Sequence, residues 1–589
     1  MKELEEIQSR KVISAYGGSG SIIETLYNGS LLIRPYDEWK CFADMKQVVT
    51  INNPRLLSLV QGSFTKVENL VAVPTPDWGD RANKVVYSPC NDDKNKTIGS
   101  YYFPGWFFCP RCRRLHKLAD WKQLWNDAKI KDKKGNEKPK LDEKFDKYFP
   151  ACYHCSEPKK KGNTTFISRQ SLEQVRFALA SFDTGNLIDI PFDKLWNLSN
   201  DGKAWVLDDA QSAPEELYYK STKGGDGLQS INIYKGDGHG APHKNMATIY
   251  NKYIVFKKGV DKGAYRVVLR NGTDVYFPNI TSCIYIPKPT PKQIKIVRSM
   301  AAAGDTIDEI AENTDLSISQ VNEILNRQGS TDPNADLFGM DEFFYITNPS
   351  IYNTKNQRRE RDFWAIRYPN LKSKRIKGFY ALRQLKETSV LTSYSRIGTS
   401  KKEWYDLNDD TVKMMPPGFK TPFREYNYNH TRYEPTYMPA VESYGEGILV
   451  EIDTNGIAGN DVLVFAHTFC HLLMKEMEFL CGYPVTSLRE KIYHDGNVIG
   501  FLIYTIQGAE GSYGGLISLM PSDTNSDGSS GDAKILKLIE AATDRAKDCP
   551  NDPICMNEKG HCFACVDLPE TSCEKFNNDL SRVVFNKYL

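Results

Sequence analysis

Cysteine pairs separated by two residues are the clearest chemical feature of the sequence. Two such pairs, Cys-Pro-Arg-Cys and Cys-Tyr-His-Cys, lie about forty residues apart and comprise Cys109, Cys112, Cys152 and Cys155. Each tight turn can present two thiolates to one tetrahedral Zn²⁺, and four sulfur ligands leave no open coordination position. The spacing therefore predicts a structural zinc site. His116 and His154 are nearby spare ligands, and ordinary buried cysteines are the alternative.

A second cysteine group lies near the C-terminus, with looser spacing. Its four predicted zinc ligands are Cys549, Cys555, Cys562 and Cys565. The pair in Cys-Phe-Ala-Cys indicates a second structural zinc ion, and His561 or Cys573 could replace one of the other two ligands. The alternative is a set of reduced thiols without metal. Together the two groups predict two structural Zn²⁺ ions as the cofactors of the chain.

Two histidines, His467 and His471, are four residues apart on a predicted helix, as in a zinc protease. Thr468 stands where such an enzyme carries its general-base glutamate, so proteolysis is not expected. Helix packing or a polar contact to the neighbouring strand is the favoured interpretation of these histidines, whose role the sequence leaves open.

Residues 355–377 interleave basic and aromatic side chains. Cations that neutralise phosphates and rings that stack on bases are the composition of a nucleic-acid groove. The predicted DNA-binding residues are Arg358, Arg359, Arg361, Trp364, Arg367, Lys374 and Arg375, with Tyr368 as a second stacking ring. The alternative is a solvated basic surface whose aromatic residues belong to the core.

Residues 306–327 have the apolar spacing of a helix-turn-helix. Ile307, Ile310 and Ala311 form one apolar stripe, and a second stripe follows a predicted cap at Ser317; it comprises Val321, Ile324 and Leu325. The second helix presents the polar but barely basic face Gln320, Asn322, Glu323, Asn326 and Arg327. Contact with DNA and contact with protein both remain open.

The sequence assigns no catalytic residue. It contains no phosphate-binding loop, no HExxH and no HxK motif of phospholipase-type nucleases. Two alternatives to a non-catalytic role are a metal-dependent nuclease in the C-terminal domain, around Tyr504 and Glu510, and a helix-turn-helix transcription regulator.

These residues must be positioned by several domains, because 589 residues exceed what one core usually supports. The periodicity predicts an α+β multidomain chain: a β-rich N-terminal part, a zinc-knuckle module, a helix-turn-helix-like insertion and an α/β C-terminal domain with the second zinc site. Residues 168–183 are predicted to be helical, 460–480 to form a long helix, and 447–452 and 498–506 to be strands. The predicted segments are 1–100, 101–225 (zinc knuckles and helix), 226–290 (strand-rich), 291–330 (helix-turn-helix-like), 331–430 (basic and aromatic, of unpredicted fold) and 431–589.

Composition limits the functional classes. The 76 basic and 74 acidic residues nearly cancel, so the chain is not a polycation that coats nucleic acid, and any contact with DNA must be local. The mixed charges at the N-terminus and the lack of a long apolar run predict a cytoplasmic protein that does not associate with membranes.

The order of these features resembles DrmB, the accessory protein family of the DISARM anti-phage defence system. The C-terminal part is similar to the four-cysteine domain that ends MrfA-type DNA-repair helicases, in the stretches 465–471, 503–504, 510–516 and 549–565. The stretches 8–23, 104–112 and 174–177 extend the resemblance. The family tends to carry a cysteine and a Gly-His pair after Arg176, whereas this chain has Ser181 and Thr184-Gly185-Asn186. Any polar contact that this motif makes in the family is therefore in doubt for this chain.

The resemblance implies a protein that pairs with DrmA, a helicase-like ATPase, to form a DNA-binding complex. The expected function is therefore that of a non-catalytic DNA-handling subunit in antiviral defence, with activity only through its helicase-type partner.

Overall fold

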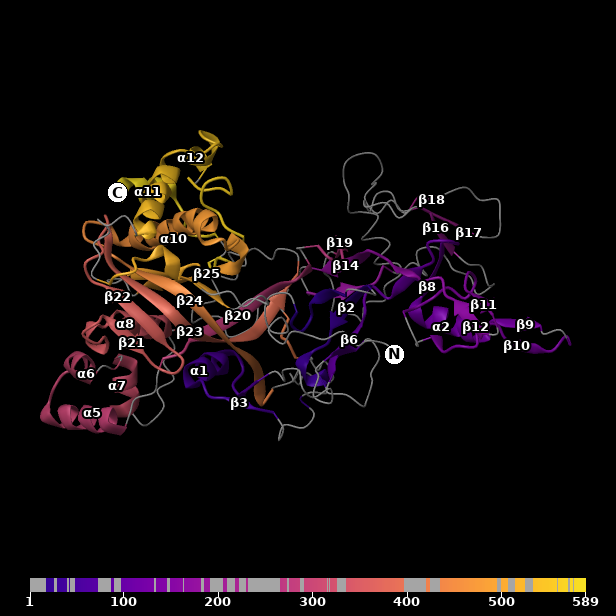
Figure 1. Ribbon diagram of the computed structural model, residues 1–589, viewed down its shortest axis with the longest axis horizontal. Coiled ribbons are helices and arrows are strands. Elements are labelled where there is room, and N and C mark those ends of the chain that lie inside the picture. Colours follow the sequence, from indigo (N-terminus) through magenta and orange to yellow (C-terminus); the bar gives the residue numbers. More distant parts are fainter. Residues whose placement is uncertain are drawn as a thin grey trace.

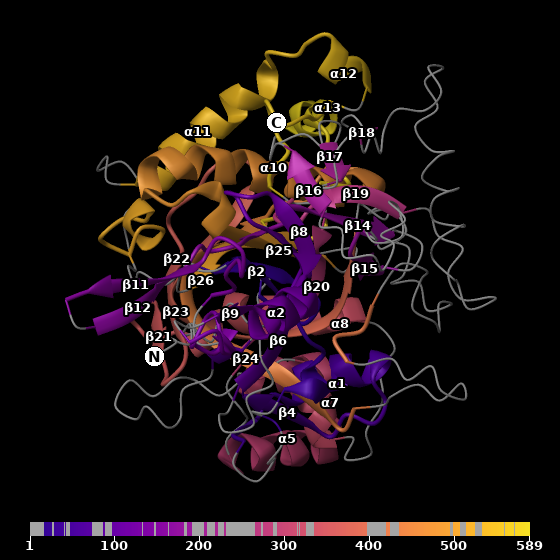
Figure 2. The ribbon, with the colours of Figure 1, turned by 90° about the vertical axis from the view of Figure 1, so that its right-hand side faces the viewer.

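The computed structural model shows a mixed α+β protein with several sheets (Figures 1 and 2). The structure describes residues 17–72 apart from 26–28, 40–41 and 43–47; 86–88; 97–190 apart from 132–133, 146–148, 163 and 182–184; 205–208; 218–221; 229–230; 265–286 apart from 273–274; 291–325 apart from 315 and 317; 335–396; 420–423; 435–494; and 499–589 apart from 507–513, 525–532, 559, 570–571 and 576. The predicted fold class is confirmed.

Two long antiparallel strands, β23 (Ile376–Ser395) and β24 (Tyr437–Ile452), connect the two ends of the molecule. One half of this ribbon pairs with β22 (Trp364–Tyr368) and β26 (Ile499–Ile506), and the other half pairs with β20 (Phe277–Ile284) and β4 (Asn69–Ala72). At Gly445 a Cβ atom would collide with the carbonyl oxygen of Thr505, so the close approach of β26 requires glycine there. The remaining strands of this sheet are β3 (Thr50–Ile51), which pairs with β4, and the two strands β21 (Gln357–Arg359) and β25 (Leu488–His494), which pair with β22 and β26.

Helices cover both faces of the C-terminal half of this sheet. The long helix α10 (Gly459–Cys481) packs on one face together with α11 (Lys534–Lys547) and α13 (Arg582–Tyr588), while α8 (Ala335–Thr347) covers the other face. Short helices complete this part: α12 (Ile554–Glu558) and the 3-10 turns η9 (Pro349–Ile351), η11 (Val485–Ser487) and η12 (Ile517–Leu519).

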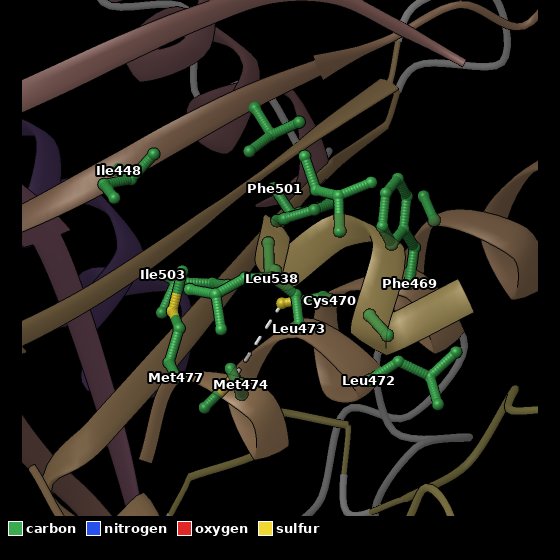
Figure 3. Close-up of a cluster of buried hydrophobic side chains, with 14 of the residues drawn as sticks. Ile448, Phe469, Cys470, Leu472, Leu473, Met474, Met477, Phe501, Ile503 and Leu538 are labelled. Carbon is green, nitrogen blue, oxygen red and sulfur yellow. Dashed lines mark hydrogen bonds between the residues drawn. The ribbon is translucent and has the colours of Figure 1, made fainter. Parts of the chain in front are cut away.

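Alternating side chains of the central strands supply both cores. On β24, Ile448 and Val450 face α10, whereas Leu449 between them faces α8. On β26, Phe501 and Ile503 likewise face α10 (Figure 3). Because successive side chains of a strand point to opposite faces, a strand covered on both sides is apolar throughout. This explains why these segments read as continuous apolar runs.

The N-terminal part is built mainly from short strands and lies at the other end of the ribbon (Figure 1). Its sheets contain β1 (Ile22–Thr25), β2 (Gly29–Ile33), β5 (Val86–Ser88), β6 (Thr97–Tyr102), β7 (Trp106–Phe108), β8 (Arg114–Lys117), β13 (Glu173–Gln174), β14 (Phe177–Ser181), β15 (Leu187–Ile188), β16 (Trp205–Asp208), β17 (Tyr218–Ser221), β18 (Gln229–Ser230) and β19 (Tyr265–Leu269). Two hairpins, β9 (Lys129–Lys131) with β10 (Glu137–Pro139) and β11 (Glu157–Lys161) with β12 (Thr164–Ser168), project from it. Helical pieces are η2 (Tyr36–Glu38), α1 (Pro54–Ser63) and α2 (Leu118–Asp127).

The prediction of a helix over residues 168–183 is wrong. This stretch contains β13 and β14, and β14 pairs with both β15 and β19. Its apolar residues Phe177 and Leu179 are buried together with Ala178 and Ala180, so both faces of the strand are covered. A short apolar run buried on both sides has no period of two, and periodicity alone does not distinguish it from a buried helix. The helix of the zinc-knuckle module is α2.

The other predicted elements are found close to their expected bounds. α10 corresponds to the predicted helix 460–480, β26 to the strand 498–506, and β24 extends the strand 447–452 toward its N-terminus. The segment 331–430, whose fold the sequence does not predict, contributes β21, β22 and β23 to the large sheet. Among the described residues no helix is long and apolar enough to cross a membrane. Where independently folding domains begin and end stays a prediction.

Candidate metal centres and the basic strand surface

The first four-cysteine set assembles around the turn between β7 and β8. The sulfur atoms of the four residues lie within 4.8 Å of one another, and Cys112 Sγ is 3.7 Å from Cys152 Sγ; the set is Cys109, Cys112, Cys152 and Cys155. In each knuckle the backbone N–H of the second cysteine donates to the sulfur of the first, at 3.5 Å for Cys112 and 3.4 Å for Cys155. Thiolates at the corners of a tetrahedron with Zn–S of about 2.3 Å would be about 3.8 Å apart. The set fits a zinc ion.

The electrostatics of this set also fit a cation. Hydrogen bonds with Cys109 and Cys152 hold the pKa of the Cys112 thiol far below its ordinary range, while contact with Cys109 and Cys112 raises the pKa of Cys152. One negative charge thus suppresses ionisation of a neighbouring thiol, as expected for closely spaced groups. A divalent cation would stabilise all four thiolates together.

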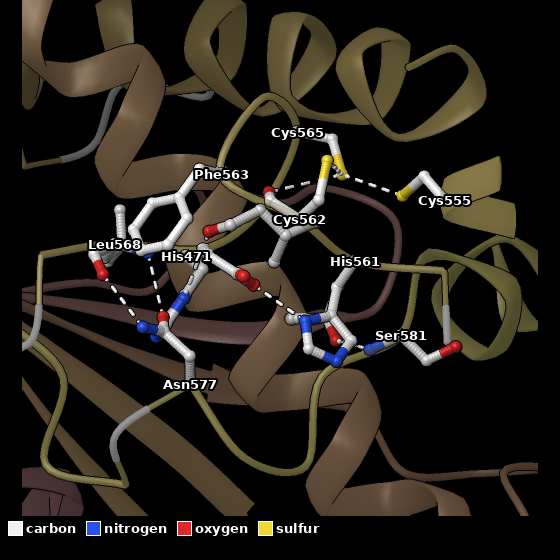
Figure 4. Close-up of polar contacts among 12 residues, drawn as sticks. His471, Cys555, His561, Cys562, Phe563, Cys565, Leu568, Asn577 and Ser581 are labelled. Atoms are coloured by element: carbon white, nitrogen blue, oxygen red, sulfur yellow. Dashed lines mark hydrogen bonds and ion pairs between the residues drawn. The ribbon is translucent and has the colours of Figure 1, made fainter. Parts of the chain in front are cut away.

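The second four-cysteine set lies beside α11 and α12 (Figure 4). Its sulfur atoms approach as closely as those of the first set: 3.5 Å for Cys549 and Cys562, and 3.7 Å from Cys565 to both Cys555 and Cys562. Asn551 donates to this set from its backbone N–H and from its side chain, each at 3.4 Å. Such N–H donors stabilise thiolates, so the second set also fits a structural zinc ion.

Both substitutes considered for the second set lie elsewhere. His561 Nδ1 is 2.7 Å from the Asp567 carboxylate, which holds the ring, and Cys573 Sγ is 3.4 Å from His467 Nε2. The four-cysteine set therefore needs neither residue. In the first module, the exposed His154 has its Nδ1 atom 3.7 Å from Cys155 Sγ, and His116 packs edge-on against Trp121 at 4.9 Å. The four sulfur atoms come together without either histidine.

The paired histidines contact the neighbouring strand, which is the interpretation that their sequence context favours. His467 and His471 project from α10 toward Glu490 of β25, with Nε2 to carboxylate distances of 3.0 and 3.1 Å. Thr468 accepts a hydrogen bond from the Ser581 backbone N–H at 2.9 Å, so it has a structural contact where a protease has its general base. All three α10 residues are fully buried.

The basic stretch forms β21, β22 and the turn into β23, and its predicted DNA-binding residues divide into two groups. Arg358 pairs with Glu360 and lies over the Tyr345 ring at 5.3 Å, and Arg375 donates to the backbone carbonyls of Tyr588 (2.6 Å) and Asn455 (2.5 Å). Internal contacts thus occupy these two guanidinium groups. The exposed members are Arg359, Arg361 and Lys374, whereas Arg367 is partly buried on β22.

Of the two aromatic residues predicted to stack on bases, Tyr368 is buried and Trp364 is partly exposed. Tyr368 is 2% exposed, belongs to the core beneath α10 and donates from its hydroxyl to the Pro521 carbonyl at 3.2 Å, so it cannot stack on a base. Trp364 is partly exposed, and two guanidinium groups lie over its ring, that of Arg359 at 4.7 Å and that of Arg383 at 5.0 Å. Sequence reasoning missed Arg383 because it lies nineteen residues downstream, brought alongside by the pairing of β22 with β23.

The predicted helix-turn-helix is a three-helix unit of α5 (Pro291–Ala303), α6 (Ile307–Thr314) and α7 (Ile318–Leu325). Val297, Ile310 and Val321 form its core, one from each helix, whereas Ile307, expected in the apolar stripe, is 40% exposed. Thr306 and Glu309 cap α6 reciprocally, with backbone N–H to side-chain distances of 2.9 and 3.3 Å. The structure does not describe the predicted cap Ser317 or the side chains of Gln320, Glu323, Asn326 and Arg327.

The residues of the nuclease alternative find little support. Tyr504 is 2% exposed and donates from its hydroxyl to Glu387 at 2.7 Å within the core beneath α8. Its hydroxyl is thus occupied by a buried carboxylate. Glu510 lies outside the described residues.

Comparison with known proteins supports the resemblance seen in the sequence. Residues 8–277 match a family described as a domain of unknown function, DUF8724. Over 468 residues the chain is 25% identical to the DISARM protein DrmB of Bacillus paralicheniformis, an alignment that covers 67% of this chain and 74% of that protein. Among solved structures, the DUF1998 helicase MrfA bound to DNA aligns at 9% identity with a TM-score of 0.20, covering 39% of this chain and 26% of MrfA, so the chain spans about a quarter of that protein's length. The chain is thus similar to DISARM protein DrmB over two thirds of its length.

Proposed function

We propose that this chain is a non-catalytic accessory subunit of an anti-phage defence complex, which handles DNA together with a helicase-type ATPase. The similarity to DISARM protein DrmB over 67% of the chain carries this proposal. In this role the ATPase supplies the energy of the reaction, and the present chain supplies a scaffold and part of the DNA-binding surface.

The metal centres suit a scaffold. Each four-cysteine set offers a complete tetrahedral ligand shell without a position for water or substrate, which is the form of a structural zinc site. The first set joins the turn after β7 to the segment before β11, and the second joins the end of α11 to the C-terminal segment. Zinc at these positions would stabilise the modules and take no part in a chemical step.

The strand surface formed by Arg359, Trp364 and Arg383 is the part best suited to DNA. The two guanidinium groups flank one indole ring across three adjacent strands, and both arginines are exposed. Arg361, two residues after Arg359, is also exposed. These exposed positive charges would contact phosphates without reading base sequence.

The test is co-expression of the tagged full-length chain with the helicase-type ATPase of its own defence system. We expect the two proteins to co-elute in size-exclusion chromatography and the complex to bind DNA more tightly than either protein alone. ATP hydrolysis should require the ATPase, since a variant with a disabled phosphate-binding loop in that partner should leave none. Failure to associate, or ATP hydrolysis or DNA cleavage by the homogeneous chain itself, would contradict the proposal.

A further inference from the structure

Four potential metal ligands meet in the core between α10 and β25, apart from both four-cysteine sets. His467 and His471 come from successive turns of α10, Glu490 from β25 and Cys573 from the C-terminal segment. The exposed fractions are 0% for both histidines and 3% for Glu490 and Cys573. One ligand atom of each residue lies within 4.8 Å of the other three. A carboxylate and a thiol are thus fully removed from water at one point, which is costly unless their charge is compensated.

A hydrogen bond to the Val566 carbonyl fixes the tautomer of His471. In this tautomer the nitrogen that faces the Glu490 carboxylate is a hydrogen-bond acceptor. Nδ1 lies 3.2 Å from the carbonyl oxygen of Val566, and a carbonyl can only accept, so Nδ1 carries the proton. The Nε2 lone pair then faces the Glu490 Oε2 atom at 3.1 Å, with an acceptor on each side. Neither atom forms a hydrogen bond of acceptable geometry within the described part of the chain. In this tautomer two acceptor lone pairs face each other in the core, an arrangement that a cation between them would stabilise.

The sulfur atom of Cys573 accepts a backbone hydrogen bond of the kind that supports metal-bound thiolates. The backbone N–H of Asn577 donates to Cys573 Sγ at 3.2 Å, and the Asn577 side chain is held by two hydrogen bonds to the backbone of Leu568, at 2.8 and 2.9 Å (Figure 4). A fixed N–H donor to sulfur also occurs in both four-cysteine sets. Metal-bound thiolates and imidazoles characteristically have such supporting contacts, and the Val566 carbonyl supplies the one for His471.

We propose that His467, His471, Glu490 and Cys573 bind a third zinc ion in a closed, structural site. Two imidazole nitrogens, one carboxylate oxygen and one thiolate are all zinc ligands, and together they make a four-coordinate shell. A tetrahedral zinc ion would place nitrogen and oxygen ligands about 3.3 Å apart and sulfur about 3.6 Å from nitrogen. His467 Nε2 lies 3.0 Å from Glu490 Oε1 and 3.4 Å from Cys573 Sγ, and His471 Nε2 lies 3.1 Å from the other carboxylate oxygen, Oε2. One ligand atom of each residue lies within 4.8 Å of the other three, which is compatible with a tetrahedral shell.

This ion would fasten three segments that are far apart in the sequence. It joins α10 to β25 and to the chain after residue 572, and the Val566 carbonyl that orients His471 follows directly after Cys565 of the second four-cysteine set. The second and third sites therefore share one segment of backbone. The four ligands are buried and complete the shell, so the ion has no position for a substrate and its role is structural.

The first experiment counts zinc in the full-length chain after a chelator wash, by inductively coupled plasma mass spectrometry. The expected count is three ions per chain. Cys573→Ala should contain two, whereas the matched control Cys283→Ala should keep three, because Cys283 is a similarly buried free thiol on β20 that belongs to none of the three clusters. A count of two in the unmodified chain, or an unchanged count of three in folded Cys573→Ala, would overturn the site.

A second pair of variants distinguishes two roles for Cys573, that of a zinc ligand and that of a residue that only fills space in the core. Cys573→Asp retains a zinc ligand and should keep the third ion and the folded state, whereas the apolar Cys573→Val should lose the ion. A residue that only fills space would tolerate valine and not aspartate, which is the opposite result. X-ray absorption at the zinc edge tests the unmodified chain even where variants fail to fold. Three sites give an average of about three sulfur and one nitrogen or oxygen neighbour per zinc, and an average of four sulfur neighbours would refute the proposal.

Discussion

Arg582 of α13 contacts both carboxylate oxygens of Asp552, at 2.8 and 3.1 Å, and the same nitrogen lies 3.6 Å from the sulfur of Cys555. The Arg582 side chain is fully buried. Four thiolates around a divalent ion leave a net negative charge, and this guanidinium group compensates part of it. The last helix of the chain is thereby joined to the second four-cysteine set.

Replacing Arg582 by methionine should destabilise the C-terminal half. The side chain keeps most of its length, but Asp552 and the cysteine set lose their buried cation, at a cost of about 3 kcal/mol in the free energy of unfolding. Chemical denaturation measures this change, and zinc release to a colorimetric chelator should become faster. Lys587→Met on the same helix is the control: its ion pair with Asp461 is exposed, so we expect a change within about 0.5 kcal/mol. Equal effects of both variants would contradict the role given to Arg582.

Removing one ligand of the first set should remove one zinc ion and destabilise the N-terminal part. We expect Cys112→Ser to lose one zinc equivalent and to become susceptible to proteolysis around β7 to β12, with the C-terminal part unaffected. Cys481→Ser is a matched control, because this partly buried cysteine belongs to neither four-cysteine set. Limited proteolysis followed by mass spectrometry locates the change. A folded, protease-resistant Cys112→Ser without the metal would show that the first set is not a structural zinc site.

His116 should make the first module sensitive to acid. Burial lowers its pKa to about 4, whereas an imidazole in an unfolded chain has a pKa of about 6.5. Between these values the unfolded chain binds more protons than the folded one, so the stabilisation is complete above about pH 6.5 and is lost as the pH falls toward 4.

The comparison of the parent chain with His116→Phe isolates this contribution. Phenylalanine preserves the edge-on contact with Trp121 but cannot be protonated. The difference between their unfolding free energies at pH 7 and pH 5 reports on His116, including its electrostatic interaction with the Cys112 thiolate. The variant should lose less stability over this interval, and parallel pH dependences would contradict the prediction.

The sequence predicts the grouping of the cysteines and the helix α10 better than it predicts the sheet. CxxC spacing places two sulfurs in one turn, and α10 has an uninterrupted helical period, so both follow from local sequence. The sheet does not, because its centre is made by pairing β23 with β24, and β20 and β4 join them from distant parts of the chain. No local pattern fixes such long-range partners.

The third candidate metal site also depends on long-range contacts that the sequence does not predict. The spacing of His467 and His471 is visible in the sequence, but their acidic partner Glu490 arrives on a strand and Cys573 from another segment. In the sequence, Cys573 lies nearer to the second cysteine group, which makes it a candidate substitute ligand there. The segment that carries Cys573 is hydrogen-bonded along β25, through Glu490 N–H to Ser572 O at 3.2 Å and Ile492 N–H to the Glu574 carboxylate at 2.9 Å, and this places Cys573 beside His467.

If the exposed arginines in and after β21 contact DNA as proposed, substitutions of neighbouring arginines should have different effects. Replacing exposed Arg359 and Arg361 together by alanine should weaken DNA binding by the complex. The slope of log K against log salt should become shallower by about 0.9 for each duplex phosphate that the protein no longer neutralises. The effect should depend little on DNA sequence, because phosphates carry no sequence information. Fluorescence anisotropy over a salt series measures both the affinity and the slope.

Arg358 provides the control within the same strand. Its guanidinium group pairs with Glu360 and lies over Tyr345, so Arg358→Ala should lower the unfolding temperature while leaving the salt slope unchanged. Trp364→Ala removes the ring that holds Arg359 and Arg383 in line, and it should weaken single-stranded more than duplex binding, by about 1 to 3 kcal/mol if a base takes the place of one guanidinium group. An unchanged affinity and salt slope in the folded Arg359→Ala, Arg361→Ala protein would exclude this surface, and DNA would then have to bind to the three-helix unit or to the partner.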